Sequence, residues 1–311
     1  MSTPFEPEAS CQDPSESSEL MPVADARAAM LSAMTPVQGR DDIALTDATG
    51  RVLAEDLVAP TDVPAHNNSA MDGYALRGVD LPSTDSVAFD VIGEAWAGKP
   101  FDGRVAERQA VKIATGAVMP AGADTVVINE RVQRTAKQLH VLAGERAGAN
   151  VRLAGEDLRC GDVALGAGTR LRAAEIGQLA SLGIRRVSVT RRLRVALFST
   201  GDELVPLESG RSLGPGDVFD SNRHSLRSAL QALGVELRDL GIVPDDAAAT
   251  QAAFDTAAAD ADAVIATGGA SISDADHVAA TLRARGEVTF WRVAMRPGRP
   301  LASGSVGGAR F

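Results

Sequence analysis

The chain has 311 residues, with 45% hydrophobic and 23% charged side chains and a formal net charge of −10. This length exceeds the roughly 100–200 residues of one ordinary domain, so two or three folding units are expected. An acidic chain without a basic stripe is poorly suited to binding DNA or RNA, and no apolar run is long enough to cross a membrane. The composition therefore favours a globular, multidomain protein whose partners are neither nucleic acids nor membranes.

The cysteines and the N-terminus indicate the compartment. Cys11 and Cys160 lie far apart, which argues against a disulfide framework. The N-terminus has polar and acidic residues where a signal peptide needs a positive start and an apolar core. We therefore expect a cytoplasmic protein. The four histidines are dispersed, so a zinc site built on imidazoles is not expected.

The N-terminal region is expected to span residues 21–185, after a disordered acidic tail over residues 1–20. That tail carries Pro, Ser and Glu with few large apolar groups, so it cannot bury enough surface to offset its ordering entropy. The pattern predicts a short helix over residues 23–34, ending before Pro36, and two strands around a turn over residues 44–58.

Apolar alternation and turn residues dominate residues 86–145. We interpret this stretch as part of a β-rich lobe inserted at about residues 62–145. A helix is predicted from Ala173 to Leu182, with Gly183 just after it, where glycine is favoured. The strand-like segments of the lobe are VAFDVIGEAW (87–96), AVKIAT (110–115), DTVVINERVQ (124–133) and QLHVLAG (138–144).

Strands alternate with helix-length segments from residue 186 onward. This alternation predicts right-handed crossovers and a doubly wound, mostly parallel α/β domain over residues 186–311. Ser221 and Asn222 are expected to cap the first helix, and another strand is predicted from Leu301. The other predicted strands are RLRVALFST (192–200), VELRDLGIV (235–243), DADAVIATGG (260–269) and EVTFWRVAM (287–295); the helices end at Leu233, follow Pro244, and cover DADHVAATLRARG (274–286).

Polar residues follow several of these strands, and ligands of such sheets bind at the carboxyl ends of the strands. Thr200-Gly201-Asp202-Glu203 offers a hydroxyl and two carboxylates suited to a hydroxylated or Mg²⁺-bound ligand; a plain turn with a capping Asp is the alternative. Arg296-Pro297-Gly298-Arg299-Pro300 holds two guanidinium groups on a stiff turn, which favours anion binding over a merely solvated loop.

A glycine-rich segment follows the third predicted strand. Thr267-Gly268-Gly269 lets the backbone approach a ligand closely, and hydroxyls and carboxylates follow it up to Asp276. The segment is neither a Walker A loop nor a dinucleotide-binding fingerprint, because the required lysine and the three-glycine spacing are missing. Its place at a strand end favours a binding role over an ordinary turn.

Three polar loops occur in the N-terminal region. Asn67 to Tyr74 is a dense polar loop with the only tyrosine of the chain, and residues 115–124 are typical of a strand exit. Arg152 precedes Gly155-Glu156-Asp157, which adds two carboxylates to a cation. Each loop taken alone is also explained as an ordinary turn.

Taken in order, these segments resemble the molybdopterin molybdenumtransferase (MoeA) family, whose eukaryotic relative is the gephyrin E domain. Their order along the chain carries the resemblance more than any single piece. The segments are NNSAMDGYA (67–75), ATGAVMPAGADTVV (114–127), GEDLRCGD (155–162), STGDEL (199–204), DSN (220–222), TGGASISDAD (267–276) and RPGRP (296–300).

The resemblance implies β-rich N-terminal lobes followed by a doubly wound, mostly parallel molybdopterin-binding domain. It implies an enzyme that inserts molybdate into adenylylated molybdopterin (molybdopterin-AMP) with Mg²⁺ and releases AMP. It also implies a homodimer with the active site between the α/β domain of one subunit and the β lobe of the other. Molybdopterin adenylyltransferase and molybdoenzymes would be its protein partners.

The resemblance further implies site residues at the matching positions. The expected catalytic residues are Asp72, Thr115, Glu203 and Asp276. The expected metal ligands are Asp262 and Asp274. The residues expected to bind the substrate are Arg152, Thr200, Gly201, Asp202, Ser221, Asn222, Gly268, Gly269, Ser271, Arg296 and Arg299.

Two other functions stay open at this point. One is a related molybdopterin nucleotidyl transferase or hydrolase on the same scaffold, and the other is a molybdopterin-binding scaffold without metal insertion. The family continues past the position of Phe311 into a small C-terminal β domain, so we expect a C-terminally truncated chain whose sheet exposes apolar surface.

Overall fold

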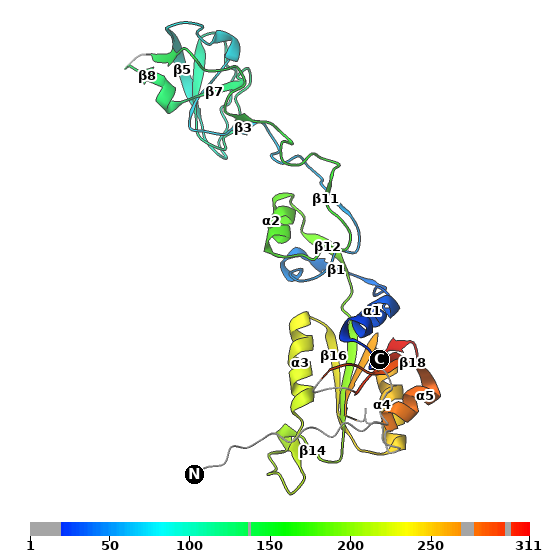
Figure 1. Ribbon diagram of the computed structural model, residues 1–311. Helices are drawn as coiled ribbons and strands as arrows, with labels where there is room; N and C mark the ends of the chain where they lie inside the picture. The colour runs from blue at the N-terminus through cyan, green and yellow to red at the C-terminus, as the bar shows by residue number, and fades with distance from the viewer. Residues whose placement is uncertain (1–19, 136–137, 269–276, 296–299) are drawn as a thin grey trace, which may run out of the picture. The chain divides into compact units, whose positions relative to one another are not determined.

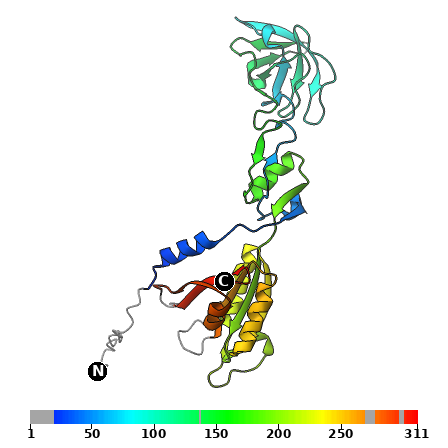
Figure 2. The ribbon, with the colours of Figure 1, turned by 90° about the vertical axis from the view of Figure 1, so that its right-hand side faces the viewer.

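The computed structural model describes residues 20–135, 138–268, 277–295 and 300–311. The chain divides into two compact units, drawn in Figures 1 and 2. One unit comprises Met1–Gly39 and Arg191–Phe311 and is called the α/β unit; the other, Arg40–Thr190, is called the β unit. The β unit is thus inserted into the sequence of the α/β unit. No helix among the described residues is long and apolar enough to span a membrane.

Helix α1 (Val23–Ala33) confirms the predicted N-terminal helix, and it packs with the α/β unit. Its buried Ala26 contacts Val293 in a small cluster to which Met30 and Leu301 also belong. A backbone bridge from Met21 to Val293 fixes the start of the helix. The N-terminal segment therefore belongs physically with residues at the other end of the chain.

The α/β unit contains a six-stranded sheet in the order β16-β13-β17-β20-β19-β18. Strands β16 (Glu236–Val243), β13 (Arg194–Thr200) and β17 (Ala263–Thr267) are parallel, as predicted. The fourth predicted strand, β18 (Gly286–Arg292), runs in the same direction as these three but does not lie beside β17; it pairs antiparallel with β19 (Pro300–Val306) at the edge of the sheet. The reason is that β19 returns directly alongside β18, and the short β20 (Ala309–Arg310) then pairs with both β19 and β17.

Helices cover both faces of this sheet (Figure 1). Alternate residues of β13 point to opposite faces: Leu197 packs toward α3 (Ser221–Leu233), and Phe198 packs toward α4 (Ala247–Ala258) and α5 (His277–Arg285). Phe198 meets Phe254 edge-on, with ring centroids 5.3 Å apart. Phe254 also meets Phe311 edge-on, with ring centroids 5.3 Å apart, and mostly small side chains fill the rest of this core. A separate two-stranded ladder joins β14 (Leu204–Val205) to β15 (Val218–Phe219).

The helix termini differ in one respect from expectation. Asp220, rather than Ser221 or Asn222, caps α3, because the Asp220 carboxylate accepts a hydrogen bond from the Arg223 backbone N–H at 3.2 Å. Gly234 ends the helix at φ 76°, as the glycine predicted. Asp246 caps α4 in the same way as Asp220 caps α3.

The β unit contains a second six-stranded sheet, in the order β7-β4-β6-β5-β9-β8. Apolar side chains lie on both of its faces: Tyr74, Leu76 and Phe89 belong to one core, and Val111 and Ile113 belong to another. Each predicted strand-like segment contains a strand. The strands are β4 (Gly73–Leu76), β5 (Ser86–Ala95), β6 (Gln109–Ile113), β7 (Thr125–Ile128), β8 (Val132–Arg134) and β9 (Leu139–Leu142).

The remainder of the β unit is built from short ladders and α2 (Ala173–Ser181), whose terminal Gly183 has φ 73° as predicted. The two strands expected over residues 44–58 are largely absent. Leu45–Asp47 forms a 3₁₀ turn instead, because Leu45 is buried in the core beneath α2. The ladders join β1 (Arg40–Ala44) to β12 (Arg186–Thr190), β2 (Leu57–Val58) to β11 (Val163–Leu165), and β3 (Asn68–Ser69) to β10 (Val151–Arg152), all antiparallel.

Candidate functional site

The carboxyl end of β13 brings together three residues of the predicted site, Thr200, Gly201 and Glu203. Gly201 follows the strand at φ 146°, and a Cβ there would lie 2.5 Å from Oε2 of Glu203. Glycine therefore lets the Glu203 carboxylate fold back over the strand end. Glu203 forms no ion pair with any described residue. Its carboxylate is therefore not neutralised by a described cation.

Thr200 and Gly268 meet where two neighbouring parallel strands end. The register pairs Ser199 with Thr267, so both strands reach the same edge. At Gly268, with φ 87°, a side chain would overlap the Thr200 carbonyl oxygen. The Thr200 hydroxyl is buried and has no hydrogen-bond partner among the described residues. A buried polar group without a partner costs stability unless something else meets it, which makes this hydroxyl a candidate ligand contact.

Asp202 fits the plainer interpretation of its motif. Its Oδ1 accepts a hydrogen bond from the Asp245 backbone N–H at 3.1 Å, which ties the turn after β13 to the loop before α4. Ser221 and Asn222 lie exposed in the first turn of α3. These three residues border the same sheet edge without a buried contact of their own.

Sequence reasoning missed the buried pair beside that helix turn. The Arg223 guanidinium donates to Asp220 and to Asp239, both at 2.7 Å, and its side chain is only 7% exposed. Burial lowers the pKa of Arg223, but the two carboxylates outweigh it and the pKa is raised. The i, i+3 spacing of Asp220 and Arg223 was the available signal.

Asp262, an expected metal ligand, lies away from this edge. It precedes β17, at the amino end of the strand, whereas Glu203 follows the carboxyl end of the parallel strand β13. Arg191 donates to both oxygens of Asp262, at 2.6 and 2.7 Å, and the Arg194 backbone N–H adds a bond at 2.8 Å. The Arg191 hydrogen bonds lower the pKa of Asp262. The carboxylate is therefore engaged by protein donors.

Six expected site residues cannot be placed in this geometry. They lie outside the residues that the structure describes: Gly269, Ser271, Asp274, Asp276, Arg296 and Arg299.

Asp72 and Thr115 meet in the β unit. The register of β4 with β6 pairs Gly73 with Ile113, which brings the residues flanking these strands together. Oδ1 of Asp72 accepts hydrogen bonds from the Thr115 backbone N–H at 2.7 Å and from the Thr115 hydroxyl at 2.9 Å. The backbone bond, followed by the hydroxyl bond, lowers the pKa of Asp72. The structure thus joins two residues that the sequence placed in separate motifs.

A cavity of about 150 Å³ adjoins Asp72 and contains two residues that sequence reasoning missed, Trp96 and Lys112. The Lys112 Nζ lies 5.3 Å from the centroid of the Trp96 ring and 3.6 Å from Glu94. Trp96 is 46% exposed. Its position as the last residue of a predicted strand, in a chain with two tryptophans, was the only signal in the sequence.

Backbone hydrogen bonds connect the other polar loops of the β unit. Ser69 donates to Ala117, and Ala70 donates to Asn150, both at 2.9 Å. Nearby, Arg152 forms ion pairs with Asp157 at 2.5 Å and Glu156 at 3.7 Å, and the Asp157 hydrogen bond is the main cause of its raised pKa. The three loops predicted as separate motifs are therefore mutually supported.

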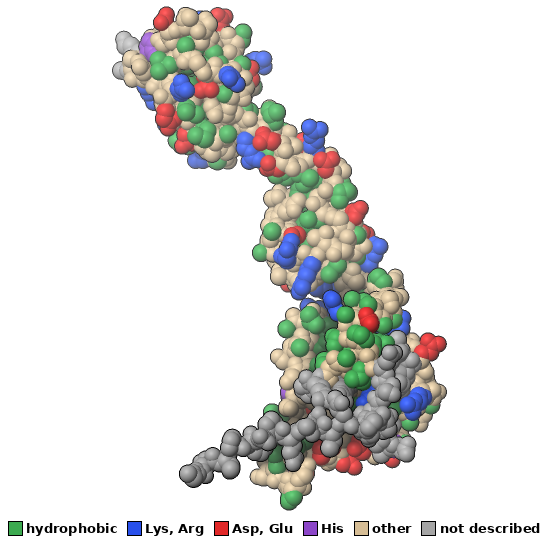
Figure 3. Space-filling view, in the orientation of Figure 1, with side chains coloured by type: hydrophobic (Ala, Val, Ile, Leu, Met, Phe, Trp, Pro, Cys, Tyr) green, Lys and Arg blue, Asp and Glu red, His purple; other side chains and the backbone are tan. Residues whose placement is uncertain are grey.

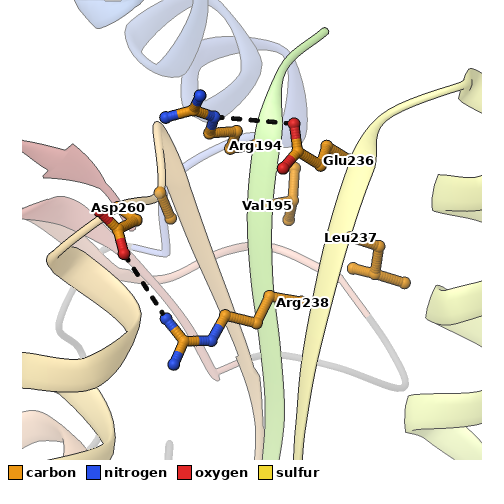
Figure 4. Close-up of a pocket in the computed structure, with 7 residues that line it drawn as sticks. Arg194, Val195, Glu236, Leu237, Arg238 and Asp260 are labelled. Atoms are coloured by element: carbon orange, nitrogen blue, oxygen red, sulfur yellow. Dashed lines mark ion pairs between the residues drawn. The ribbon is translucent and has the colours of Figure 1, made fainter.

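A larger cavity, of about 380 Å³, lies at the amino end of the α/β sheet (Figure 4). Arg194 faces Glu236 at 3.7 Å, and Arg238 faces Asp260 at 4.0 Å. Each guanidinium already has a carboxylate partner, and the cavity is remote along the strands from Thr200. Size alone therefore does not identify the substrate site. Among the described residues, no group of three or more His, Cys, Asp or Glu side chains is placed to hold a metal.

Two family models match the chain over nearly its whole length. Residues 21–183 match the MoeA N-terminal region (domains I and II), and residues 196–310 match a probable molybdopterin binding domain. The chain belongs to the MoeA family. The first match contains Asp72 and Thr115, and the second contains Thr200, Glu203 and Gly268.

Individual MoeA relatives agree with this assignment. A molybdopterin molybdenumtransferase of Haemophilus influenzae is 39% identical over 92% of this chain and 70% of its own length. One from Nostoc is 40% identical over 85% of this chain and 61% of its own length. The chain thus spans about three fifths to seven tenths of the length of these relatives.

Solved structures also resemble the chain. A molybdopterin biosynthesis MoeA protein from Pyrococcus horikoshii aligns over 94% of this chain and 73% of its own, with a TM-score of 0.78 and 31% identity. Another structure of a molybdopterin biosynthesis MoeA protein from Pyrococcus horikoshii aligns with a TM-score of 0.81 and 29% identity, over the same shares. Both matches extend across the β unit and the α/β unit.

Proposed function

We propose that this chain inserts molybdate into molybdopterin-AMP with release of AMP. The observation that carries the proposal lies within the region that matches the molybdopterin-binding model. There, the buried Thr200 hydroxyl lacks a partner among the described residues, beside the unpaired Glu203 carboxylate. Because strand edges of this type collect ligand contacts in α/β sheets, this is the position for the phosphate-bearing part of the substrate.

Mg²⁺ is part of the proposal, and the described residues fit it. Mg²⁺ prefers oxygen donors and is commonly held by one or two protein carboxylates together with substrate phosphates and water. Glu203 supplies such a carboxylate, and the Thr200 hydroxyl supplies a neutral oxygen at the same edge. When bound, Mg²⁺ would neutralise charge on the pyrophosphate and make AMP a better leaving group.

The protein's own residues have separate proposed tasks. Asp72, held in its ionised form by Thr115, would orient a donor group of the substrate or take up a proton from it. Arg296 and Arg299 would bind phosphate or molybdate, and Arg152 would add a cation to the β-unit site. The dithiolene sulfurs of the substrate would bind molybdenum, so no protein thiolate is needed.

Self-association is also proposed. Helix α1 leaves Val23, Leu31 and Met34 each at least half exposed, and these three side chains line a mostly apolar cavity of about 280 Å³ together with residues that include Met295 and Leu301. Figure 3 shows hydrophobic side chains gathered over this part of the α/β unit. A contiguous apolar surface of this kind favours a protein interface. A homodimer in the cytoplasm, receiving substrate from molybdopterin adenylyltransferase and passing product to molybdoenzymes, is the corresponding arrangement.

The decisive experiment follows AMP release. Purified chain is incubated with molybdopterin-AMP, molybdate and Mg²⁺, and AMP is quantified over time. We expect Glu203→Gln to lower the rate by about 10²-fold or more, as expected for loss of a transition-state charge contact. Asp217→Asn, which removes a carboxylate of the same unit that pairs with Arg211, is the matched control.

Absence of AMP release from the unsubstituted chain would contradict the proposal. Tight binding of molybdopterin-AMP without turnover would instead support a binding scaffold. A light-scattering mass equal to one subunit at micromolar concentration would contradict the proposed dimer while leaving the catalytic proposal intact.

A further inference from the structure

The cavity beside Asp72 combines three features that suit a flat, nitrogen-rich ring. Trp96 offers an exposed aromatic surface, Lys112 supplies a cation near it, and Asp72 supplies a carboxylate. The cavity volume of about 150 Å³ is half the lower limit of roughly 300 Å³ for pockets that enclose drug-sized ligands. It therefore has room for one ring system rather than for a complete nucleotide.

The Trp96 ring is held in place by its surroundings. The Trp96 and Lys99 backbones exchange hydrogen bonds of 2.9 Å across a tight turn that directly follows β5. The indole N–H donates to Glu94 at 3.3 Å. An aromatic ring that is already oriented loses little conformational freedom when a ligand stacks on it. The ring thus resembles a prepared platform.

A simple surface cluster is the competing explanation for these side chains. Glu94 and Lys112 are directly opposite in the register of β5 and β6, and such cross-strand pairs commonly stabilise sheets. That explanation accounts for the ion pair. It does not account for an aromatic residue left 46% exposed on a concave surface beside an incompletely used carboxylate.

The carboxylate determines which edge of a ring would be recognised. Both hydrogen bonds from Thr115 go to Oδ1 of Asp72, and Oδ2 accepts none from the described residues. An ionised carboxylate only accepts hydrogen bonds. A 2-amino-4-oxopyrimidine ring, as in pterins, presents a ring N–H and an amino group side by side, so it matches Asp72. Adenine presents a donor beside an acceptor and matches less well.

We infer that Trp96 and Asp72 bind the pterin ring of the substrate, with Trp96 stacking on its face and Asp72 accepting hydrogen bonds from its amino edge. This inference rests on the proposed function and assigns the ring-recognition part of that function to the β unit. Lys112 lies near the stacking platform, where a cation favours the electron-rich oxygen of the pterin ring. AMP would then be recognised elsewhere.

Calorimetric titration of the full-length chain with neopterin, and separately with AMP, tests this inference. Trp96→Ala should weaken neopterin binding by about tenfold or more, since stacking of a base on an aromatic side chain commonly contributes this much. Trp96→Phe keeps a ring and should restore most of the affinity. Phe219→Ala, which removes a 41% exposed aromatic residue from the α/β unit, and Trp291→Phe are matched controls that should leave it unchanged.

Asp72→Asn provides a second test that preserves shape. It replaces acceptors by a group that also donates, so neopterin binding should fall while the circular dichroism spectrum stays the same. The inference is overturned if neopterin does not bind the unsubstituted chain, if Trp96→Ala binds it with equal affinity, or if Trp96→Ala weakens AMP and neopterin equally.

The AMP-release assay separates this inference from the proposed function. If the chain turns over and Trp96→Ala raises KM without changing kcat, both hold. If the chain releases no AMP but binds neopterin in a Trp96-dependent way, the proposed function fails and ring recognition stands. If turnover is normal and the KM of Trp96→Ala is unchanged, ring recognition fails and the proposed function stands.

Discussion

Thr115 donates two hydrogen bonds to one oxygen of Asp72, from its backbone N–H at 2.7 Å and its hydroxyl at 2.9 Å. These two residues are 43 positions apart in the sequence. Asp72 lies just before β4, and Thr115 lies just after β6. Their junction keeps a surface carboxylate ionised and fixes which of its oxygens remains open. The same junction gives the first of four predictions.

Thr115→Val should raise the pKa of Asp72 only part of the way to its ordinary value. The backbone N–H, the larger cause of the lowered pKa, is retained, and only the hydroxyl is lost. Because the pKa of Asp72 is depressed in the folded state, any stability it adds is present above the unfolded pKa and is lost as pH falls through the folded value. NMR titration of the side-chain carboxyl carbon measures the change.

A matched variant controls for the loss of a threonine hydroxyl. Thr135→Val removes a hydroxyl that donates to the Gln138 carbonyl, remote in sequence from Asp72, and should leave the Asp72 titration unchanged. An unchanged Asp72 pKa in Thr115→Val would show that the hydroxyl does not act on the carboxylate.

Asp262→Asn should weaken folding without weakening catalysis. Asp262 receives two charge-assisted bonds from Arg191 and one bond from Arg194, so the substitution should cost about 1–3 kcal/mol of the free energy of unfolding. The lowered pKa of Asp262 means that this contribution is present near neutral pH and is lost as pH falls through the folded value. Urea denaturation at pH 7 and in acid would show the difference shrinking.

The catalytic half of this prediction uses AMP release. Since Asp262 lies at the amino end of β17, its substitution should leave the Mg²⁺ dependence of the rate unchanged. Asp260→Asn removes a neighbouring carboxylate, 79% exposed, whose ion pair is at 4.0 Å, and is the stability control. A shifted Mg²⁺ dependence in Asp262→Asn would restore the metal-ligand role expected from the sequence.

Gly268→Ala should destabilise the α/β unit more than another glycine substitution at positive φ. Gly268 and Gly241 have φ of 87° and 80°, so alanine is strained at both. Only at Gly268 would the added Cβ overlap the Thr200 carbonyl; at Gly241 the space is open. We expect Gly268→Ala to exceed Gly241→Ala by about 1–3 kcal/mol in thermal or urea unfolding. Equal losses of stability in the two variants would mean that the ends of β13 and β17 move apart at no cost to make room for the Cβ.

Arg223→Met should be strongly destabilising. The substitution leaves Asp220, whose side chain is 1% exposed, and Asp239 without their shared cation. Breaking a buried pair of this kind costs about 3–5 kcal/mol. Arg227 also faces Asp239, at 3.6 Å, but is 46% exposed, so Arg227→Met should cost under about 1 kcal/mol. Chemical denaturation followed by circular dichroism compares the two variants.

The fold could be predicted from sequence wherever local patterns agree with tertiary pairing. Alternating strands and helices predicted the parallel core of β16, β13 and β17, and the Gly183 and Gly234 termini followed from their chain positions. The neighbours of the remaining strands of this sheet could not be predicted in this way. The apolar sequence of residues 287–295 suits a place beside β17 as well as the observed place beside β19. It therefore did not determine the neighbour of β18.

The candidate site could be predicted only in part from the sequence. Strand-end reasoning predicted Thr200, Glu203 and Gly268 as site residues, and the structure brings all three to one edge of the sheet. It could not separate Asp262 from these residues, because a carboxylate before a strand and one after a strand look alike in sequence but lie at opposite sheet edges. It missed Trp96, because its meaning depends on a register between β5 and β6 that only the fold supplies.

The insertion of the β unit has a consequence for engineering and for descent. Its two connections lie side by side: Arg191 N–H donates to the Gly39 carbonyl at 3.1 Å, and Arg40 pairs with Thr190 in the β1–β12 ladder. The chain therefore enters and leaves the β unit at two adjacent positions. A short turn between positions 39 and 191 would close the α/β unit without interrupting any of its strands, so the two halves of the molecule form separable modules that a single recombination event could join or part.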